Sequence, residues 1–234
     1  MKKPYIKLLE KVAGFKVYEV DGTYVRGKIN EEFTNFGEYY LFKFIPKDEF
    51  WIDRERAPGE TNFFVEHLLL ENRLMREGKN RRRAVDLAEE AERKERAKTK
   101  LAKKIKKYKG GEAAKAAHKK LLKEYSRPGG VQVWVVRGEM VRDRFYVDFT
   151  EGGHDLVYSF VPKGEVWLDD DLSIKERGFV LLHELHERGL MVRGRGYEEA
   201  HKSASRIEYE CRKKPERLEK EIEKEIKKNL KSGR

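Results

Sequence analysis

The sequence predicts an α+β protein made of two copies of one small lobe, and three observations carry this prediction. Residues 14–92 align with residues 130–208 without a gap when the chain is shifted by 116 positions. Each copy begins with stretches of alternating β-branched and aromatic residues, and it ends with stretches whose apolar residues follow helical spacing. Strands that precede helices in this way favour a small antiparallel sheet with two helices on one face, in the order ββββαα.

The repeat is supported by many matches in a single register. The segment "FIPKDEFWID" falls on "FVPKGEVWLD", and "FFVEHLLLENRLMREG" falls on "FVLLHELHERGLMVRG". Identical pairs include Gly22 with Gly138, Arg26 with Arg142, Pro46 with Pro162, Trp51 with Trp167, Glu60 with Glu176, Met75 with Met191 and Glu92 with Glu208. We therefore divide the chain into an N-terminal lobe (1–92), a lysine-rich helical linker (93–129), a C-terminal lobe (130–208) and a charged helical tail (209–234).

Four short strands are expected to open each lobe. In the C-terminal lobe they are predicted in "VQVWVV", "RFYVDFT", "LVYSFVP" and "EVWLDD", which turn residues separate. Trp167 in the last strand and its counterpart Trp51 are expected to pack in the two cores. His154 lies in the glycine-rich stretch "EGGHD" and is expected in a turn.

Two helices are expected to complete each lobe. In the C-terminal lobe the first begins after a capping residue, Ser173, and ends at Gly194 or Gly196, and the second begins near Tyr197. Their apolar stripes are Phe179, Leu182, Leu185, Leu190 and Met191 in the first, and Tyr197, Ala200, Ala204 and Ile207 in the second. After Pro215 the tail has Leu218, Ile222, Ile226 and Leu230 at four-residue spacing, which predicts a further helix.

The linker holds almost all of the excess positive charge. The chain has a formal net charge of +11, and residues 93–128 alone contain 15 Lys and Arg against 3 acidic residues. Two helical stretches interrupted at Gly110 and Gly111 predict a helical hairpin with a lysine-rich outer surface. Such a surface would bind the phosphates of DNA or RNA, alone or in a ribonucleoprotein, with little choice of sequence, although lysines on helices often serve only solubility. The candidate nucleic-acid contacts are Lys98, Lys100, Lys103, Lys104, Lys106, Lys107 and Lys109.

Composition excludes several classes of protein. A single cysteine, Cys211, permits neither an internal disulfide nor a four-cysteine zinc cluster, so a metal site must use His, Asp and Glu. The charged fraction of 41% and the single glutamine are typical of thermophile proteins. No apolar run is long enough to span a bilayer, and no secretory signal is visible, so we expect a cytoplasmic protein.

Histidines and glutamates gather in the two helices of the C-terminal lobe. His183 and Glu187 are four residues apart and share a helix face, and the following helix can bring His201 to the same point. Two histidines and a carboxylate suit a divalent transition metal, above all zinc, and leave one coordination position open for water. Glu184 is then placed to act as the general base for that water. Three further residues are expected to support a ligand or replace one: Glu208, His186 and Tyr197.

Through "HELHE" at 183–187, the C-terminal lobe resembles the zincin-type metallopeptidases. Their motif is His-Glu-x-x-His on a helix, with a third ligand farther along the chain and a strand near the cleft that pairs with extended substrate. The resemblance implies that His183 is the first ligand, that Glu184 is the base and that "EVWLDD" is the strand at the cleft. Glu187 stands where the family has its second histidine, and the match covers only the two helices of one lobe. The resemblance implies a metal hydrolase without identifying one.

The N-terminal copy serves as an internal comparison. It keeps His67 and Glu71, the counterparts of His183 and Glu187, but has Leu68 in place of Glu184 and Val85 in place of His201. This joint difference is expected if one metal site persists only in the C-terminal lobe, and gradual drift toward an apolar core would give the same result. The sequence thus predicts a metal-dependent hydrolase with a degenerate first lobe, and its alternative is a non-enzymatic nucleic-acid or ribonucleoprotein binding protein.

Overall fold

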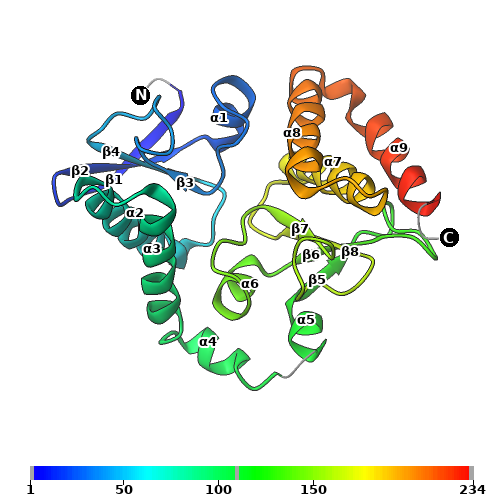
Figure 1. Ribbon diagram of the computed structural model, residues 1–234, viewed down its shortest axis with the longest axis horizontal. Coiled ribbons are helices and arrows are strands. Elements are labelled where there is room, and N and C mark those ends of the chain that lie inside the picture. The colour runs from blue at the N-terminus through cyan, green and yellow to red at the C-terminus, as the bar shows by residue number, and fades with distance from the viewer. Residues whose placement is uncertain (1–2, 109–110, 232–234) are drawn as a thin grey trace. The chain divides into compact units, whose positions relative to one another are not determined.

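A computed structural model describes residues 3–108 and 111–231 and has the predicted α+β fold (Figure 1). It contains two compact units, the first comprising Met1–Lys107 with Arg142–Asp148 and the second comprising Tyr108–Val141 with Phe149–Arg234. Each unit holds a four-stranded sheet and a pair of long helices, so the prediction of two similar lobes is confirmed.

The first unit contains the N-terminal copy of the repeat. Its elements are β1 (Tyr5–Val12), β2 (Phe15–Val20), α1 (Gly22–Lys28), β3 (Phe36–Gly37), β4 (Glu49–Asp53), a 3₁₀ turn (Pro58–Glu60), α2 (Thr61–Arg76), α3 (Arg81–Arg96) and α4 (Lys100–Ile105). The strands lie in the order β1-β2-β4-β3. Phe15, Val17, Phe50, Ile52 and Phe64 form the core between this sheet and α2.

The second unit contains most of the C-terminal copy. Its elements are α5 (Gly111–Ala117), β5 (His118–Leu121), β6 (Gln132–Val136), α6 (Gly138–Arg144, of which the last three residues belong to the first unit), β7 (Gly152–His154), β8 (Glu165–Asp169), α7 (Ile174–Val192), α8 (Tyr197–Lys213), a 3₁₀ turn (Pro215–Arg217) and α9 (Leu218–Lys231). The strand order is β5-β6-β8-β7, the same as in the first unit. The common topology agrees with the repeat in the sequence.

Both sheets are mixed, so the prediction of antiparallel sheets was wrong. The two central strands of each sheet are parallel, and only the outer strands pair antiparallel. Val17 lies opposite Phe50 in the first unit, and Val133 lies opposite Val166 in the second, 116 positions farther on. Parallel neighbours require a crossover connection, and α1 and α6 occupy this connection in the two copies.

Two of the four expected strands in the C-terminal copy are not strands. The stretches "VQVWVV" and "EVWLDD" contain β6 and β8 as predicted, but "RFYVDFT" follows α6 as a turn segment and "LVYSFVP" is also a turn segment. The outer strands are instead β5 and β7. Both misassigned stretches contain buried apolar residues, among them Phe149 in the first and Val161 in the second.

The linker does not form the predicted helical hairpin. α3 ends at Arg96, and the Thr99 side chain accepts a hydrogen bond from the Ala102 N–H and starts the short helix α4. On the other side, α5 ends at Ala117 and the chain continues as β5. The ring of His118 stacks on Trp134 at 4.0 Å, and its Nε2 lies 2.8 Å from Glu165. These contacts hold residues 118–121 in the sheet, although their local sequence favours a helix. Gly110 and Lys109 lie outside the described residues.

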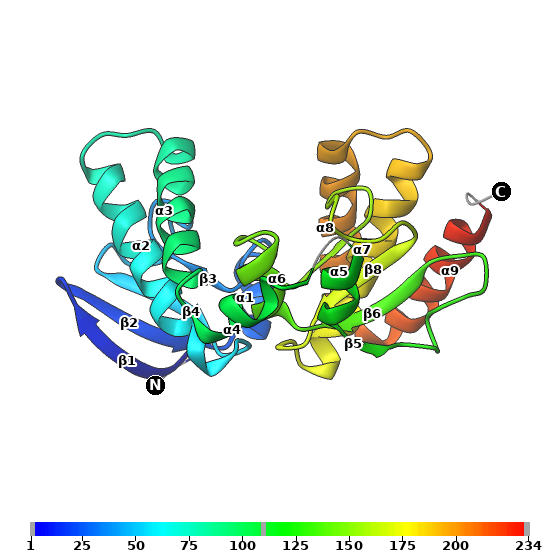
Figure 2. The ribbon, with the colours of Figure 1, turned by 90° about the horizontal axis from the view of Figure 1, so that it is seen from below.

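The long helices of the second unit follow the sequence prediction. Ser173 Oγ accepts a hydrogen bond from the Glu176 N–H at the start of α7, and Gly194, with a φ of +88°, follows its end. α8 begins at Tyr197, and α7 lies between α8 and α9 (Figure 2). Ile222 and Ile226 of α9 pack into the same core as Leu182 and Leu185 of α7. Trp51 and Trp167 are buried as predicted. Among the described helices, none combines the length and apolar character needed to cross a membrane.

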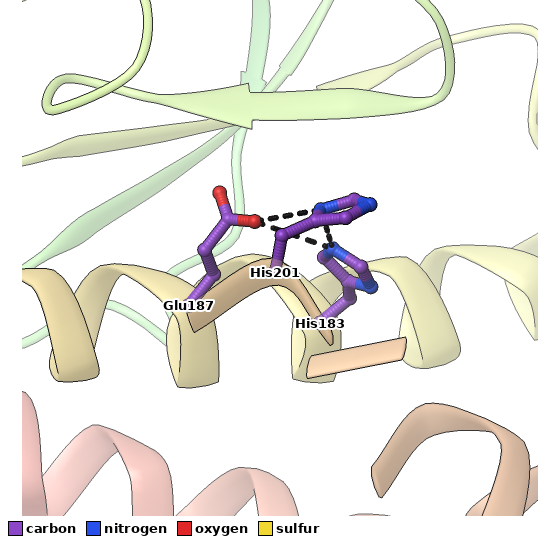
Figure 3. Close-up of side chains that lie close together, drawn as sticks. All are labelled: His183, Glu187 and His201. Carbon is purple, nitrogen blue, oxygen red and sulfur yellow. Dashed lines mark hydrogen bonds and ion pairs between the residues drawn. The ribbon is translucent and has the colours of Figure 1, made fainter. Parts of the chain in front are cut away.

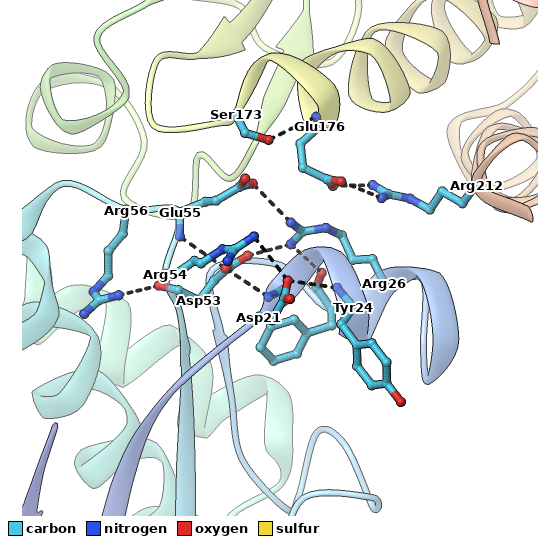
Figure 4. A network of polar contacts seen from close by, with 12 residues as sticks. Asp21, Tyr24, Arg26, Asp53, Arg54, Glu55, Arg56, Ser173, Glu176 and Arg212 are labelled. Atoms are coloured by element: carbon cyan, nitrogen blue, oxygen red, sulfur yellow. Dashed lines mark hydrogen bonds and ion pairs between the residues drawn. The ribbon is translucent and has the colours of Figure 1, made fainter. Parts of the chain in front are cut away.

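We predict that alanine has opposite effects at two glycines of the same helix, α1. Gly22 donates its N–H to the buried Asp53 carboxylate, which also accepts from Arg26 (Figure 4), and a Cβ at position 22 would overlap this carboxylate. Gly22→Ala should therefore destabilise the protein by about 1–3 kcal/mol. Gly27 has open space around it, so Gly27→Ala should stabilise it by about 0.5–1 kcal/mol. Chemical denaturation of both variants measures the difference, and equal effects would contradict the role of this contact.

Candidate metal centre

Helices α7 and α8 bring two histidines and a carboxylate together (Figure 3). His183 and Glu187 lie one turn apart on α7, and His201 lies on α8. His201 Nδ1 is 2.8 Å from Glu187 Oε2 and 3.2 Å from His183 Nε2, which is itself 3.7 Å from Glu187 Oε2. The three residues form a group that can hold a metal ion.

The separations of these three atoms suit a small divalent ion. Zinc bonds to nitrogen and carboxylate oxygen are about 2.0–2.1 Å long, so two ligand atoms of a tetrahedral site lie about 3.3–3.4 Å apart. The observed separations of 2.8, 3.2 and 3.7 Å bracket this value. The side chain of His201 is 35% exposed, so one side of the group faces solvent. The donor set fits zinc, and it does not single zinc out from other divalent transition metals.

A chain of buried charges orients His183. Its Nδ1 lies 2.9 Å from Glu208, and Glu208 accepts a hydrogen bond from Arg212 Nε at 2.9 Å. Arg212 also pairs with the buried Glu176 at 2.8 Å (Figure 4). In the neutral ring, with Nδ1–H donated to Glu208, the lone pair of Nε2 is directed at Glu187 and His201. Glu208 is thus placed as a support for a ligand, one of the two roles expected from the sequence.

The charges in this group are strongly coupled. Burial opposes the protonated form of His183, but the hydrogen bonds that this form donates to Glu187 and Glu208 outweigh burial and raise its pKa well above the usual value. Burial alone would raise the pKa of Glu187, but hydrogen bonds with His154, His183 and His201 lower it far below the usual value. Glu187 is therefore ionised at neutral pH, which is the form that binds a cation.

Glu184 differs from Glu187, although the two lie on the same helix. It is only 9% exposed, and burial raises the pKa of its carboxyl to about 7. One of its oxygens lies within 4.8 Å of both His154 and Glu187 donor atoms. A buried carboxyl with a pKa near neutrality, close to one of the three convergent donors, Glu187, can exchange a proton at neutral pH as a general base must.

His154 belongs to this centre, and the sequence interpretation missed it. Instead of lying in a turn, it ends strand β7 and is completely buried, with Nε2 3.0 Å from Glu187 Oε1. Its Nδ1 accepts the Leu156 N–H, so in the neutral ring Nε2 carries the proton and donates it to Glu187. This hydrogen bond holds Oε1 and leaves Glu187 Oε2 for the other two donors. His154 therefore positions the carboxylate of Glu187.

The signal for His154 was the pair of glycines in front of it. A Cβ at Gly152 would approach Val180 and Glu184 of α7, and a Cβ at Gly153 would overlap the ring of Tyr158. Gly152 lets β7 run close to α7, and Gly153 makes room for Tyr158, so the strand brings His154 to Glu187. Glycines inside a strand often mark such a close approach.

Two other residues predicted near the site have different surroundings. His186 contacts Glu225 of α9 through Nδ1 at 2.9 Å and Ser203 through Nε2 at 3.0 Å, so both of its nitrogens are engaged away from the three convergent donors. The ring of Tyr197 stacks on His201, with 5.4 Å between the ring centroids. His186 thus joins α7 to α9, and Tyr197 supports the ring of His201.

The first unit has counterparts of the residues that orient His183, but it lacks counterparts of Glu184, His201 and His154. His67 Nδ1 lies 2.8 Å from Glu92, Glu92 pairs with Arg96, and Arg96 pairs with Glu60. This is the same chain of charges as in the second unit, 116 positions earlier. Leu68 and Val85 stand at the positions of Glu184 and His201, and Glu38 stands at the position of His154. Among the described residues, no group in the first unit brings three metal donors together.

The strand assigned to the cleft by the zincin resemblance is in the wrong place. "EVWLDD" forms β8, which pairs with β6 on one side and β7 on the other, so it has no free edge. The outer strand beside α7 is β7. The lysines proposed for nucleic acid are exposed from Lys98 to Lys107, and Lys98 pairs with Glu95 at 2.5 Å.

No protein-family model, curated protein or solved structure matches this chain. Any assignment of function therefore rests on the structure and the residues alone.

We predict that Glu184 makes the metal-free protein less stable as the pH rises. A carboxyl whose pKa is raised by folding stabilises the protein below its unfolded pKa and loses that contribution as the pH passes its folded pKa, here about 7. Between pH 5 and 8, the stability of the native protein relative to Glu184→Gln should fall by about 2–3 kcal/mol. Urea unfolding in the presence of a chelator measures this, and parallel pH profiles would contradict a buried, titrating Glu184.

Proposed function

We propose that the second unit is a metal-dependent hydrolase of zincin-like chemistry and that the first unit is a degenerate copy that serves as a scaffold. The observation that carries the proposal is the convergence of His183 Nε2, His201 Nδ1 and Glu187 Oε2 beside a buried Glu184. Relative to the zincin motif, Glu187 replaces the second histidine, and His201 supplies the second nitrogen. Peptides are the first substrate class to test.

Each residue of the centre has one role in this proposal. His183, Glu187 and His201 hold the ion, for which zinc is the first choice. Once bound, such an ion acidifies a water and polarises a carbonyl or phosphoryl oxygen. Glu184 accepts the proton of the attacking water and passes it to the leaving group. Glu208 and His154 fix the orientation of His183 and Glu187 through hydrogen bonds.

We predict that the purified protein binds close to one equivalent of a divalent transition metal and that His183→Ala abolishes this binding. The matched control is His67→Ala, which removes the corresponding histidine and its bond to Glu92 from the first unit, where Val85 replaces the third donor. Elemental analysis and titration with zinc measure both variants. Less than about a tenth of an equivalent in the native protein, or equal losses in the two variants, would contradict the proposal.

We predict that Glu184→Gln keeps the metal and loses hydrolysis. Glutamine has nearly the same size and cannot accept the proton of water, so kcat should fall by about 100-fold or more at unchanged metal content. A panel of quenched fluorescent peptides is the first assay, and phosphodiester and small amide substrates follow. Full activity with bound metal would show that Glu184 is not the base.

A second function is supported by the exposed lysines at the end of α3 and along α4. The six described lysines between Lys98 and Lys107 are all exposed, and dense positive charge of this kind binds phosphate backbones. We propose as the alternative that this segment binds nucleic acid or a ribonucleoprotein, with or without catalysis in the second unit. Neutralising these lysines should weaken binding to duplex RNA by about tenfold or more and flatten its salt dependence. Unchanged affinity in a filter-binding titration would count against this function.

A further inference from the structure

Helix α9 covers one face of α7 in the second unit. Its Ile222 and Ile226 pack in the core, and Leu218 lies within 3.0 Å of where a Cβ on Gly178 of α7 would stand. Farther along, Glu225 contacts His186, and Asn229 accepts from Arg188 and donates to the carbonyl of Leu185. The apolar face that α7 and α8 present here is thus closed by a helix of the same chain.

The corresponding face of the first unit is a groove. A cavity of about 660 Å³ lies over α2 and α3, and its apolar lining is Phe15, Leu69, Leu70 and Ala91. Shifted by 116 positions, these residues correspond to Val131, Leu185, His186 and Ile207. Val131, Leu185 and Ile207 belong to the core that receives α9, and His186 binds Glu225 of α9. The repeat therefore identifies an amphipathic helix as the kind of element that closes this groove.

A second observation points to a ligand at the same place. Asn72, which lines the groove, is 3% exposed, and its amide donates to Glu38. Its Oδ1 is buried and accepts no hydrogen bond from the described residues. A buried acceptor without a donor is costly. In the second unit the residue at this position, Arg188, is bonded to Asn229 of α9. There Arg188 is the donor and Asn229 of α9 is the acceptor, so at Asn72 Oδ1 the incoming helix would supply the donor instead.

The groove does not suit α9 of a second copy. Leu70 replaces His186, so the carboxylate of Glu225 would be buried against an apolar side chain. Arg73 replaces Gly189, the residue at which Asn229 and Glu225 come close to α7. The incoming helix therefore has an apolar residue on the side that faces Leu70, and its carboxylates lie on the side that faces Arg73.

The charged residues that line the groove are Arg73, Arg76, Lys94, Glu66 and Glu95, and the two arginines indicate the flank of the incoming helix. Arg73 and Arg76 stand where the second unit has Gly189 and Val192. Arg73 makes only an exposed ion pair with Glu77 at 3.9 Å, and the guanidinium of Arg76 lies over the ring of Phe15 at 4.9 Å. Both can exchange these contacts for a carboxylate that arrives beside the apolar floor.

We propose that this groove of the first unit binds an amphipathic helix of a partner protein. The helix has apolar side chains at four-residue spacing on the face toward Leu69 and Leu70, a side-chain donor that faces Asn72, and carboxylates on the flank that faces Arg73 and Arg76. The binding is independent of the metal centre, because none of the lining residues belongs to that centre.

A designed peptide tests the proposal on the full-length protein. The probe is a fluorescein-labelled peptide with the sequence of residues 215–231 that carries Glu225→Leu, Lys224→Glu and Lys228→Glu and keeps Asn229. Fluorescence anisotropy should show saturable binding. Leu70→Glu in the groove should weaken it by about tenfold or more, and Arg73→Glu should weaken it severalfold at low salt. Ile174→Glu, which changes an exposed apolar residue of the second unit, should have no effect.

Each outcome of this experiment decides one point. Absence of saturable binding overturns the proposal, as does equal affinity of the Leu70→Glu and Ile174→Glu proteins, provided that thermal unfolding shows all variants to be folded. A peptide with the unmodified sequence of residues 215–231 should bind at least about tenfold more weakly. If it binds as tightly as the probe and depends equally on Leu70, the occupant is α9 of a second copy and the assignment to a partner protein is overturned.

Discussion

The second unit depends on one buried chain of charges, which runs from Glu176 through Arg212 and Glu208 to His183. Each member is almost removed from water and is stable there only because its neighbours compensate it. Breaking such a chain at one point leaves uncompensated buried charge, at a cost of about 3–5 kcal/mol. The first unit contains the same chain from Glu60 through Arg96 and Glu92 to His67. The chain of charges is therefore a feature of the shared scaffold. In each copy it connects the second long helix (α3 or α8) to the start of the first (α2 or α7).

The candidate metal centre uses this scaffold without altering it. Glu208 already fixes the tautomer of His183, so a site needs only a second nitrogen, a correctly turned carboxylate and a base. His201, His154 and Glu184 supply these three features, and all three differ from their counterparts in the first unit. Comparison of the two copies within one chain thus distinguishes the residues that stabilise the shared fold from the residues that form the candidate metal centre.

The sequence predicted the parts of the structure that depend on local pattern. Helical spacing, the Ser173 cap and Gly194 located α7 and α8, and the four-residue spacing of Leu218 to Leu230 located α9. The meeting of His183, Glu187 and His201 followed from helix geometry and a short turn. Strands β5 and β7 were missed because they are held by distant partners: His118 by Trp134 and Glu165, and His154 by Glu187. The parallel pairing of the central strands was missed because the crossover helix between them is only seven residues long.

The position of α9 also bears on the order in which the chain acquires its structure during synthesis. The first unit places its core residues Phe15 to Leu68 within a short stretch, whereas the core of the second unit extends from Leu122 to Ile226. Until α9 has left the ribosome, the apolar face formed by Leu182, Leu185 and Cys211 has no cover. The helix that α9 covers, α7, also carries His183 and Glu187, two of the three candidate metal donors. The core of the second unit is thus completed by a helix that is synthesised after α7 and α8, whereas the core of the first unit does not include that helix.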